Sequence, residues 1–190
     1  MRLLDYIKKC LEDKQFKKIW EEENPEFSNN IMFESKNMVT ELSLSEALSI
    51  LETIEDNDLT KIINNKGVHP NIDNYIKTEV IFYEQDNNCP VEDFLNSIID
   101  NKLKSKTLRN ILELAMEGNN AKPSLSKYVD DGIFELRTKQ GSNIDRIFYF
   151  FIFGNKIIMT NGYIKKTQKL DEQEFKKAKK YRDNYMKKFK

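Results

Sequence analysis

The stretch that decides the fold is Gly132–Lys169, GIFELRTKQGSNIDRIFYFFIFGNKIIMTNGYIKKTQK. Apolar and aromatic residues run almost without a break through Ile144–Phe153 and resume in Lys156–Ile164. Between these runs lies Gly154-Asn155, a pair typical of a hairpin turn. Upstream, Phe134–Lys139 alternates in polarity as a strand does. The stretch therefore predicts three neighbouring strands.

Cations recur in this stretch at strand spacing. Alternation places Glu135, Arg137 and Lys139 on one face of the first strand. The outer ends of the next two strands carry Arg146 and the pair Lys165-Lys166. We therefore expect Arg137, Arg146 and Lys165 or Lys166 to meet at one site that holds a polyanion. The alternative interpretation is a solvated sheet edge.

The order G-x-x-E-L-R, R-x-x-Y-F and G-x-x-K-K-T-Q-K, followed by a lysine-rich helix, resembles the phage-derived HigB-like branch of the RelE toxin superfamily. The resemblance covers about Glu79–Lys190, with a strand at Glu79–Tyr83 and helices at Pro90–Ile98 and Lys102–Glu117. It implies a small endoribonuclease that cuts messenger RNA, usually on the ribosome and without a metal or other cofactor.

The N-terminal part has a different character. Residues 3–20 form an amphipathic segment, and Pro25 ends helical structure after it. Farther on, Leu42–Leu48, Asp58–Lys66 and Pro70 resemble the helix-turn-helix of HigA-like antitoxins. We therefore predict an α+β protein with two domains. A helical, HigA-like domain spans residues 1–77, and a RelE-like domain with two helices, a mostly antiparallel sheet and a terminal helix spans residues 78–190.

The recognition helix of this helix-turn-helix opens with Glu55-Asp56-Asn57-Asp58. A helix in the major groove lies between phosphates and normally supplies cations to them. The residues near the expected reading surface are Asn57, Lys61 and Lys66. We expect a degenerate motif that does not bind DNA; a functional repressor and an unrelated helical cap are the alternatives.

Charge is distributed unevenly along the chain. Residues 1–77 hold 10 Lys/Arg against 15 Asp/Glu, residues 78–190 hold 21 against 16, and residues 139–190 hold 14 against 5. A local excess of this size favours a phosphate backbone as partner. Cys10 and Cys89 have no partner motif, and no apolar run is long enough to cross a membrane, so we expect a reduced cytoplasmic protein.

Metal-free RNA cleavage requires a base for the 2′-OH and cations for the phosphorane. The guanidinium groups of Arg137 and Arg146 suit the phosphate, because their planar fork matches two phosphate oxygens. The adjacent Lys165 and Lys166 disfavour each other's charged form, so one of them is a candidate base, beside a tyrosine or a carboxylate. His69, the single histidine, lies in a turn and is not expected to act.

Further residues are candidates for binding RNA rather than for chemistry. Tyr163 shares strand parity with Lys165 and could stack on a base, and Lys139, Gln168 and Lys169 could position the substrate. Tyr149 is expected in the core. Glu135 and Asp145 are expected to pair with neighbouring arginines. The lysine-rich helix Asp171–Lys190 is either a packing helix with a solvated face or a second grip on RNA.

The sequence thus predicts an endoribonuclease restrained by its own N-terminal domain, within one chain or by exchange between two chains of a homodimer. One rival is a transcriptional regulator in which a dead toxin fold serves for dimerisation. A second is a permanently inactive toxin–antitoxin fusion.

Overall fold

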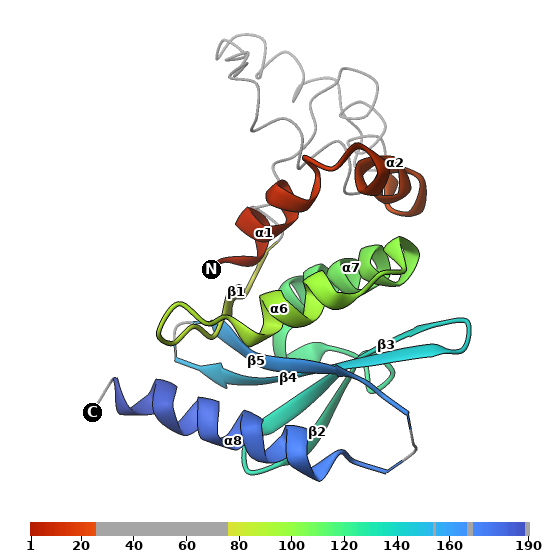
Figure 1. Cartoon of the computed structure of the whole chain (residues 1–190). Helices are drawn as coiled ribbons and strands as arrows, with labels where there is room; N and C mark the ends of the chain where they lie inside the picture. Colours follow the sequence, from red (N-terminus) through yellow and green to blue (C-terminus); the bar gives the residue numbers. More distant parts are fainter. Residues whose placement is uncertain (26–75, 154, 167–168, 189–190) are drawn as a thin grey trace, which may run out of the picture. The chain divides into compact units, whose positions relative to one another are not determined.

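The computed structural model describes residues 1–25, 76–153, 155–166 and 169–188. The described residues form an α+β unit around one five-stranded sheet (Figure 1). Its strands are β1 (Glu79–Phe82), β2 (Ser126–Asp130), β3 (Ile133–Gln140), β4 (Asn143–Ile152) and β5 (Lys156–Ile164). The helices are α1 (Leu3–Cys10), α2 (Lys14–Glu23), α6 (Pro90–Ser97), α7 (Asn101–Glu117), the short 3-10 helix η3 (Gly118–Asn120) and α8 (Glu172–Lys187).

The sheet runs in the order β1-β5-β4-β3-β2 and is mostly antiparallel. β1 alone runs parallel to its neighbour, with Glu79 opposite Lys156. The predicted strands within Gly132–Lys169 and the predicted helices at α6, α7 and α8 are confirmed to within a few residues. The short edge strand β2 was not predicted from the sequence.

Helices cover both faces of the sheet (Figure 1). On one face, α6 packs on β5 and α7 on β3. The approach of α6 depends on Gly162, because a Cβ atom there would lie 2.1 Å from the ring of Phe94. On the other face, α8 buries Phe175 and Ala178 against Ile133, Phe148 and Tyr163.

A β-bulge in β5 changes which residues face α8. Phe148 pairs with Asn161, whereas the next residue, Tyr149, pairs with Met159, so Thr160 is the extra residue. Because a bulge shifts strand parity by one, Ile158 faces α8 before it and Tyr163 faces α8 after it. The bulge therefore decides which lysine after β5 lies on the α8 side.

Aspartates at three helix starts explain where those helices begin. Their carboxylates accept hydrogen bonds from backbone N–H groups of the first turn, which would otherwise lack a partner. They are Asp13 before α2, Asp100 before α7 and Asp171 before α8. The cap at Asp13 also divides the segment at residues 3–20, which we predicted as one amphipathic stretch, into two helices.

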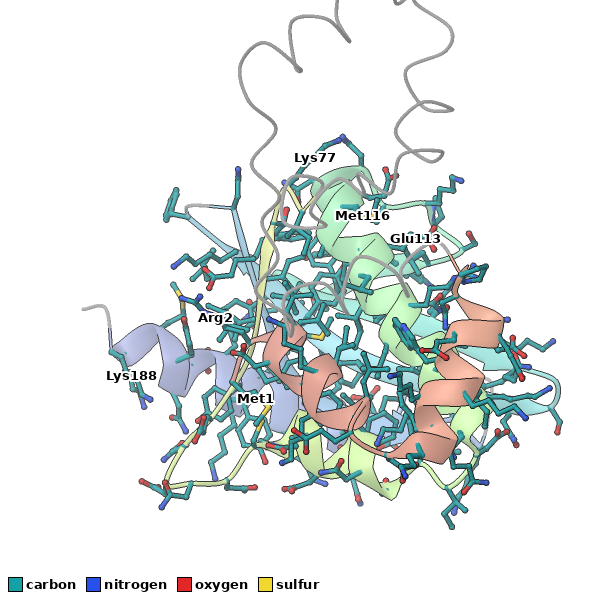
Figure 2. The ribbon with its side chains drawn as sticks, turned by 90° about the horizontal axis from the view of Figure 1, so that it is seen from above. Met1, Arg2, Lys77, Glu113, Met116 and Lys188 are labelled. Carbon is teal, nitrogen blue, oxygen red and sulfur yellow. The ribbon has the colours of Figure 1, made fainter. Side chains whose placement is uncertain are left out.

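Both N-terminal helices belong to the same compact unit as residues 76–190. α1 and α2 lie over the helical layer (Figure 2) and bury Leu3, Tyr6, Ile7, Phe16 and Trp20. The Tyr6 hydroxyl donates to Asn96 at 2.8 Å, and the Asn24 amide donates to Ser105 on α7 at 2.7 Å.

This arrangement differs from the predicted division at residue 77, because the apolar stripe of residues 3–20 is buried against α6 and α7. Pro25–Tyr75 form the second unit. The predicted helix-turn-helix, with Asn57, Lys61, Lys66 and His69, lies outside the described residues. Among the residues that are described, no helix has the length and apolarity to cross a membrane.

Replacing Trp20 tests whether α2 is part of this unit. Trp20 is fully buried, so Trp20→Ala should lower the free energy of unfolding by about 3–5 kcal/mol. Hydrogen exchange of the β4 and β5 amides should accelerate accordingly, because these amides exchange through global opening. Unchanged exchange in the sheet would show that α2 folds independently of it. Glu22→Ala, on the exposed side of α2, is the control.

Candidate functional site

The site forms where β3, β4 and the end of β5 lie side by side. Arg137 on β3 is directly opposite Arg146 on β4, and Arg146 is opposite Tyr163 on β5. Side chains of directly opposed residues project from the same sheet face. Three strands thus present these side chains together on the α8 side of the sheet.

A buried carboxylate, Glu135, stands at the centre of this cluster. It is 4% exposed. Its oxygens lie 3.3 Å from Arg137 Nε, 3.4 Å from Arg146 Nε and 3.8 Å from Lys165 Nζ. The Tyr163 hydroxyl donates to it at 3.1 Å. We call these five residues the Glu135 hub; its three cations and one carboxylate leave an excess of two positive charges.

The hub fixes how the two guanidinium groups point. Both contact Glu135 through Nε, the inner edge of the group. The Nη1 atom of Arg146 donates to the carbonyl oxygens of Asp145 at 2.6 Å and Thr138 at 3.4 Å. Burial lowers the pKa of Arg146, and the negative charge of Glu135 opposes that effect. Within the described residues no hydrogen bond or ion pair engages the Nη atoms of Arg137. Its outer fork is therefore available to a ligand.

A groove of about 390 Å³ opens beside the arginines. One wall is α7, with Lys106, Asn110 and Glu113, and the other is formed by β3 and β4. We call this groove the arginine groove. Its strand side carries Arg137, Thr138, Lys139 and Arg146, and Ser124 and Leu125 also line it. Four cations against one carboxylate make the lining suitable for a phosphate backbone.

Polar side chains of α7 support the strand wall from behind. The Asn110 amide donates to the Arg137 carbonyl and to the Thr138 hydroxyl, both at 3.1 Å. The Thr107 hydroxyl lies 2.5 Å from a carboxylate oxygen of Asp145. Asn110 and Thr107 were not predicted from the sequence. A single polar residue per turn of a helix does not indicate which residues of the sheet it will contact.

Asp145 differs from its prediction. Its carboxylate contacts Thr107 rather than an arginine, because strand alternation turns it to the face opposite Arg146. It is buried, and burial raises the pKa of Asp145 to about 6. The expected pairing with arginine holds for Glu135 alone.

The other predicted site residues are placed as follows. Lys165 reaches the hub, whereas Lys166 is exposed. Lys139 is exposed at the groove rim, and the Lys169 carbonyl accepts a hydrogen bond from Lys165 Nζ. Gln168 lies outside the described residues. Tyr149 is in the core, as predicted.

The role expected of Tyr163 does not fit the structure. Its ring is buried and stacks on Phe148 with centroids 5.5 Å apart, so no open face remains for a base. Hydrogen bonding to Glu135 engages its hydroxyl, and burial together with the charge of Glu135 raises the pKa of Tyr163. Tyr163 thus helps to hold Glu135.

Several cations of α8 are engaged within the chain. Arg182 pairs with Asp131 at 3.0 Å, Lys179 with Asp130 at 3.3 Å and Lys177 with Glu174. These contacts favour the packing interpretation of this face of α8. Among the described residues, no group of three or more His, Cys, Asp or Glu side chains is placed to hold a metal ion.

Comparison with known proteins bears on the segment that carries the hub and the groove. Residues 93–183 match the family described as phage derived protein Gp49-like (DUF891). This segment is Gp49-like. The Gp49-like family is related to the RelE/HigB-like toxins. The match includes β2 to β5, α7 and most of α8, and leaves α1, α2 and β1 outside. No curated protein matches the chain.

The raised pKa of Asp145 predicts a pH-dependent stability. The pKa is about 6 in the folded chain against 3.8 ordinarily, so ionising this group opposes folding as pH rises from about 4 through 6. Asp145→Asn should therefore raise the free energy of unfolding by up to roughly 3 kcal/mol at pH 8 and change it little at pH 4. Urea titrations at both pH values measure this.

The control for that measurement is Asp183→Asn. Asp183 is exposed and pairs with Arg182 at the surface, so its replacement should change stability by less than about 1 kcal/mol at either pH. Equal pH dependence in the Asp145→Asn variant and the unmodified protein would contradict the assignment.

Proposed function

We propose that this protein is a metal-independent endoribonuclease that binds messenger RNA in the arginine groove. The observation that carries the proposal is the arrangement of Arg137 and Arg146. Glu135 holds the inner edge of both guanidinium groups, and the outer edge of Arg137 is unengaged within the described residues and lines the groove with Arg146. A planar fork of this kind binds two oxygens of one phosphate.

The chemistry follows from that placement. When the 2′-oxygen attacks the phosphorus of a bound scissile phosphate, negative charge develops on the phosphate oxygens. The two arginines would neutralise that charge. Fixed cations in a partly buried groove stabilise such charge more strongly than water does, because they need no reorganisation. The bond to the 5′-oxygen breaks, and the expected products carry a 2′,3′-cyclic phosphate and a 5′-hydroxyl. Lys106 and Lys139 would contact the flanking phosphates.

The rival function is a toxin fold without cleavage, in a regulator or a permanently inactive fusion. The observation in its favour is that all three hub cations contact Glu135, an arrangement that would also suit a purely structural cluster. The two functions differ in what they require of Arg137. A structural cluster needs only the contact of its Nε with Glu135, whereas RNA cleavage also needs its free Nη atoms in the groove.

Replacing the arginines tests the proposal. Arg137→Ala and Arg146→Ala should each slow cleavage of a synthetic RNA by about 100- to 1000-fold, the effect of losing one donor to a developing oxyanion. Arg137→Lys should recover only part of this, because lysine keeps the charge and lacks the fork. Single-turnover assays with EDTA present measure the rates. Lys9→Ala removes a cation on α1 that pairs with Glu92, and serves as control.

Cleavage that is lost with EDTA and restored by magnesium contradicts the metal-independent reading. Near-normal rates in folded variants at both arginines contradict the site. An RNA bound without any cleavage, together with tight binding to a specific DNA, would favour the regulator.

We further propose that the N-terminal, antitoxin-like part restrains the nuclease. The support is the opposite charge of residues 1–77 and 78–190, with 10 Lys/Arg against 15 Asp/Glu in the first part. A tethered segment acts at an effective concentration that reaches millimolar, so even a micromolar contact would leave the site about 99.9% covered.

The packing of α1 and α2 dictates how this restraint is tested. Expressing residues 78–190 alone would expose the α7 surface that Phe16 and Trp20 cover. The better variant replaces residues 26–75 by a linker. Asn24 bonds to Ser105 and Thr78 to Ala115, ten residues apart on α7, or about 15 Å along the helix. A flexible linker of about eight Gly/Ser residues spans that distance.

This linker variant should arrest growth and degrade RNA, whereas the intact chain should be nearly harmless. Growth curves and RNA integrity after induction measure the difference, and Arg137→Ala in the linker variant is the control for loss of the site. A folded linker variant no more toxic than the intact chain would show that residues 26–75 do not inhibit.

A further inference from the structure

Asp145 is a buried carboxylate that the proposed phosphate contacts leave without a role. It is 1% exposed, and its Oδ1 atom has no hydrogen-bond partner among the described residues. Thr138 lies directly opposite Asp145 on β3, so the two side chains project from the same face of the sheet. An ionised carboxylate with an open oxygen costs more to bury than the neutral amide of Asn, which has the same shape. Structural anchoring therefore does not account for an aspartate here.

The environment of Asp145 suits both of its protonation states. The Thr107 hydroxyl has one proton and two acceptors in reach, Asp145 Oδ2 at 2.5 Å and the Leu103 carbonyl at 2.8 Å. When Asp145 is ionised, Thr107 donates to it. When Asp145 is protonated, it can donate to Thr107, which then donates to Leu103. The site is thus arranged to take up a proton and to release it.

Thr138 connects this carboxylate with the arginine groove. Its hydroxyl oxygen accepts a hydrogen bond from Asn110 at 3.1 Å, so its own proton is not used in that contact and can turn toward Asp145, the residue opposite it on β4. Thr138 also lines the groove, and its carbonyl accepts from Arg146 Nη1 at 3.4 Å. A phosphate on the arginine fork would therefore lie beside Thr138, with the neighbouring ribose at the floor of the groove.

We propose that Thr138 and Asp145 form the proton relay that activates the 2′-OH of the bound RNA. The proposal rests on the endoribonuclease function proposed above. As the 2′-oxygen attacks phosphorus, its proton passes to the Thr138 oxygen and the Thr138 proton passes to Asp145. The bond from phosphorus to the 5′-oxygen breaks, and that oxygen takes a proton from water. Asp145 then returns its proton through Thr138 to solvent, so the hydroxyl is restored.

The charges around Asp145 are compatible with this role. The charged residues of the groove and of the Glu135 hub that surround Asp145 are Arg146 on its own strand, Glu135, Arg137 and Lys139 on β3, Lys106 and Glu113 on α7, and Lys165 after β5. Burial raises its pKa, whereas Thr107, Thr138 and Arg146 lower it, and the result is about 6. A base with this pKa is ionised at neutral pH and still able to accept a proton.

The test compares single-turnover RNA cleavage by the full chain and its variants between pH 5 and 8. Thr138→Val keeps the shape and removes the hydroxyl, so we expect a loss of about 100- to 10,000-fold. Thr138→Ser keeps the hydroxyl and should lose less than about 10-fold. Asp145→Asn should be as impaired as Thr138→Val although its fold is more stable.

A third variant separates a catalytic role from a structural one. Thr107→Val removes a hydrogen bond that lowers the pKa of Asp145, so the acid limb of the rate profile should move to higher pH. Carbon-13 NMR of the Asp145 carboxyl in the full chain should show the same shift in the pKa. An unmoved limb with a shifted pKa would overturn the relay.

The outcomes distinguish the two proposals. Cleavage by the unmodified chain that persists within about 3-fold in folded Thr138→Val and Asp145→Asn overturns the relay and leaves the endoribonuclease standing. No cleavage by the unmodified chain at enzyme excess overturns both, since single-turnover assays detect even the roughly 0.1% of open chains expected under restraint.

Discussion

One buried carboxylate organises the functional end of this protein. Glu135 draws Arg137, Arg146 and Lys165 to within 4 Å, and Tyr163 donates to it. A carboxylate that is buried from solvent is stable only when cations and hydrogen-bond donors contact it. Cations that are largely removed from water need a negatively charged partner for the same reason. The consequence is directional. Glu135 engages each guanidinium through Nε, and Arg146 Nη1 also donates to the Asp145 and Thr138 carbonyls. The Nη atoms of Arg137 have no hydrogen bond or ion pair among the described residues, and both arginines line one groove.

The groove draws on both faces of the sheet. The hub residues belong to the α8 side, whereas Thr138 and Asp145, each one residue along the chain from an arginine, belong to the α7 side. They meet because β3 and β4 extend past the start of β2 and the groove runs along that uncovered end. The two arginines, Thr138 and Asp145 thus come together from two neighbouring strands, β3 and β4.

α7 links the N-terminal helices with this site. Ser105 accepts a hydrogen bond from Asn24, Thr107 contacts Asp145, and Asn110 supports Arg137 and Thr138. The N-terminal helices α1 and α2 therefore lie next to α7, the helix that forms one wall of the arginine groove. The inclusion of these helices enlarges the core of the unit, since Trp20, Tyr6 and Ile7 are fully buried in it.

The sequence by itself determined the local elements and the chemistry available to them. Alternation in Phe134–Lys139, the apolar runs on either side of Gly154-Asn155 and the lysine-rich helix identified the strands, the hairpin and α8, because backbone periodicity is written directly in residue order. Only the tertiary structure decided which side chains meet. The bulge at Thr160 selects Lys165 over Lys166, and the burial of the Leu3–Trp20 stripe places α1 and α2 in the sheet's own unit. Packing on α7 gives Asp145 a threonine hydroxyl as its partner in place of the expected arginine. The physical reason is that periodicity fixes the face of an element, whereas the partner on that face depends on register, bulges and packing between segments far apart in the chain.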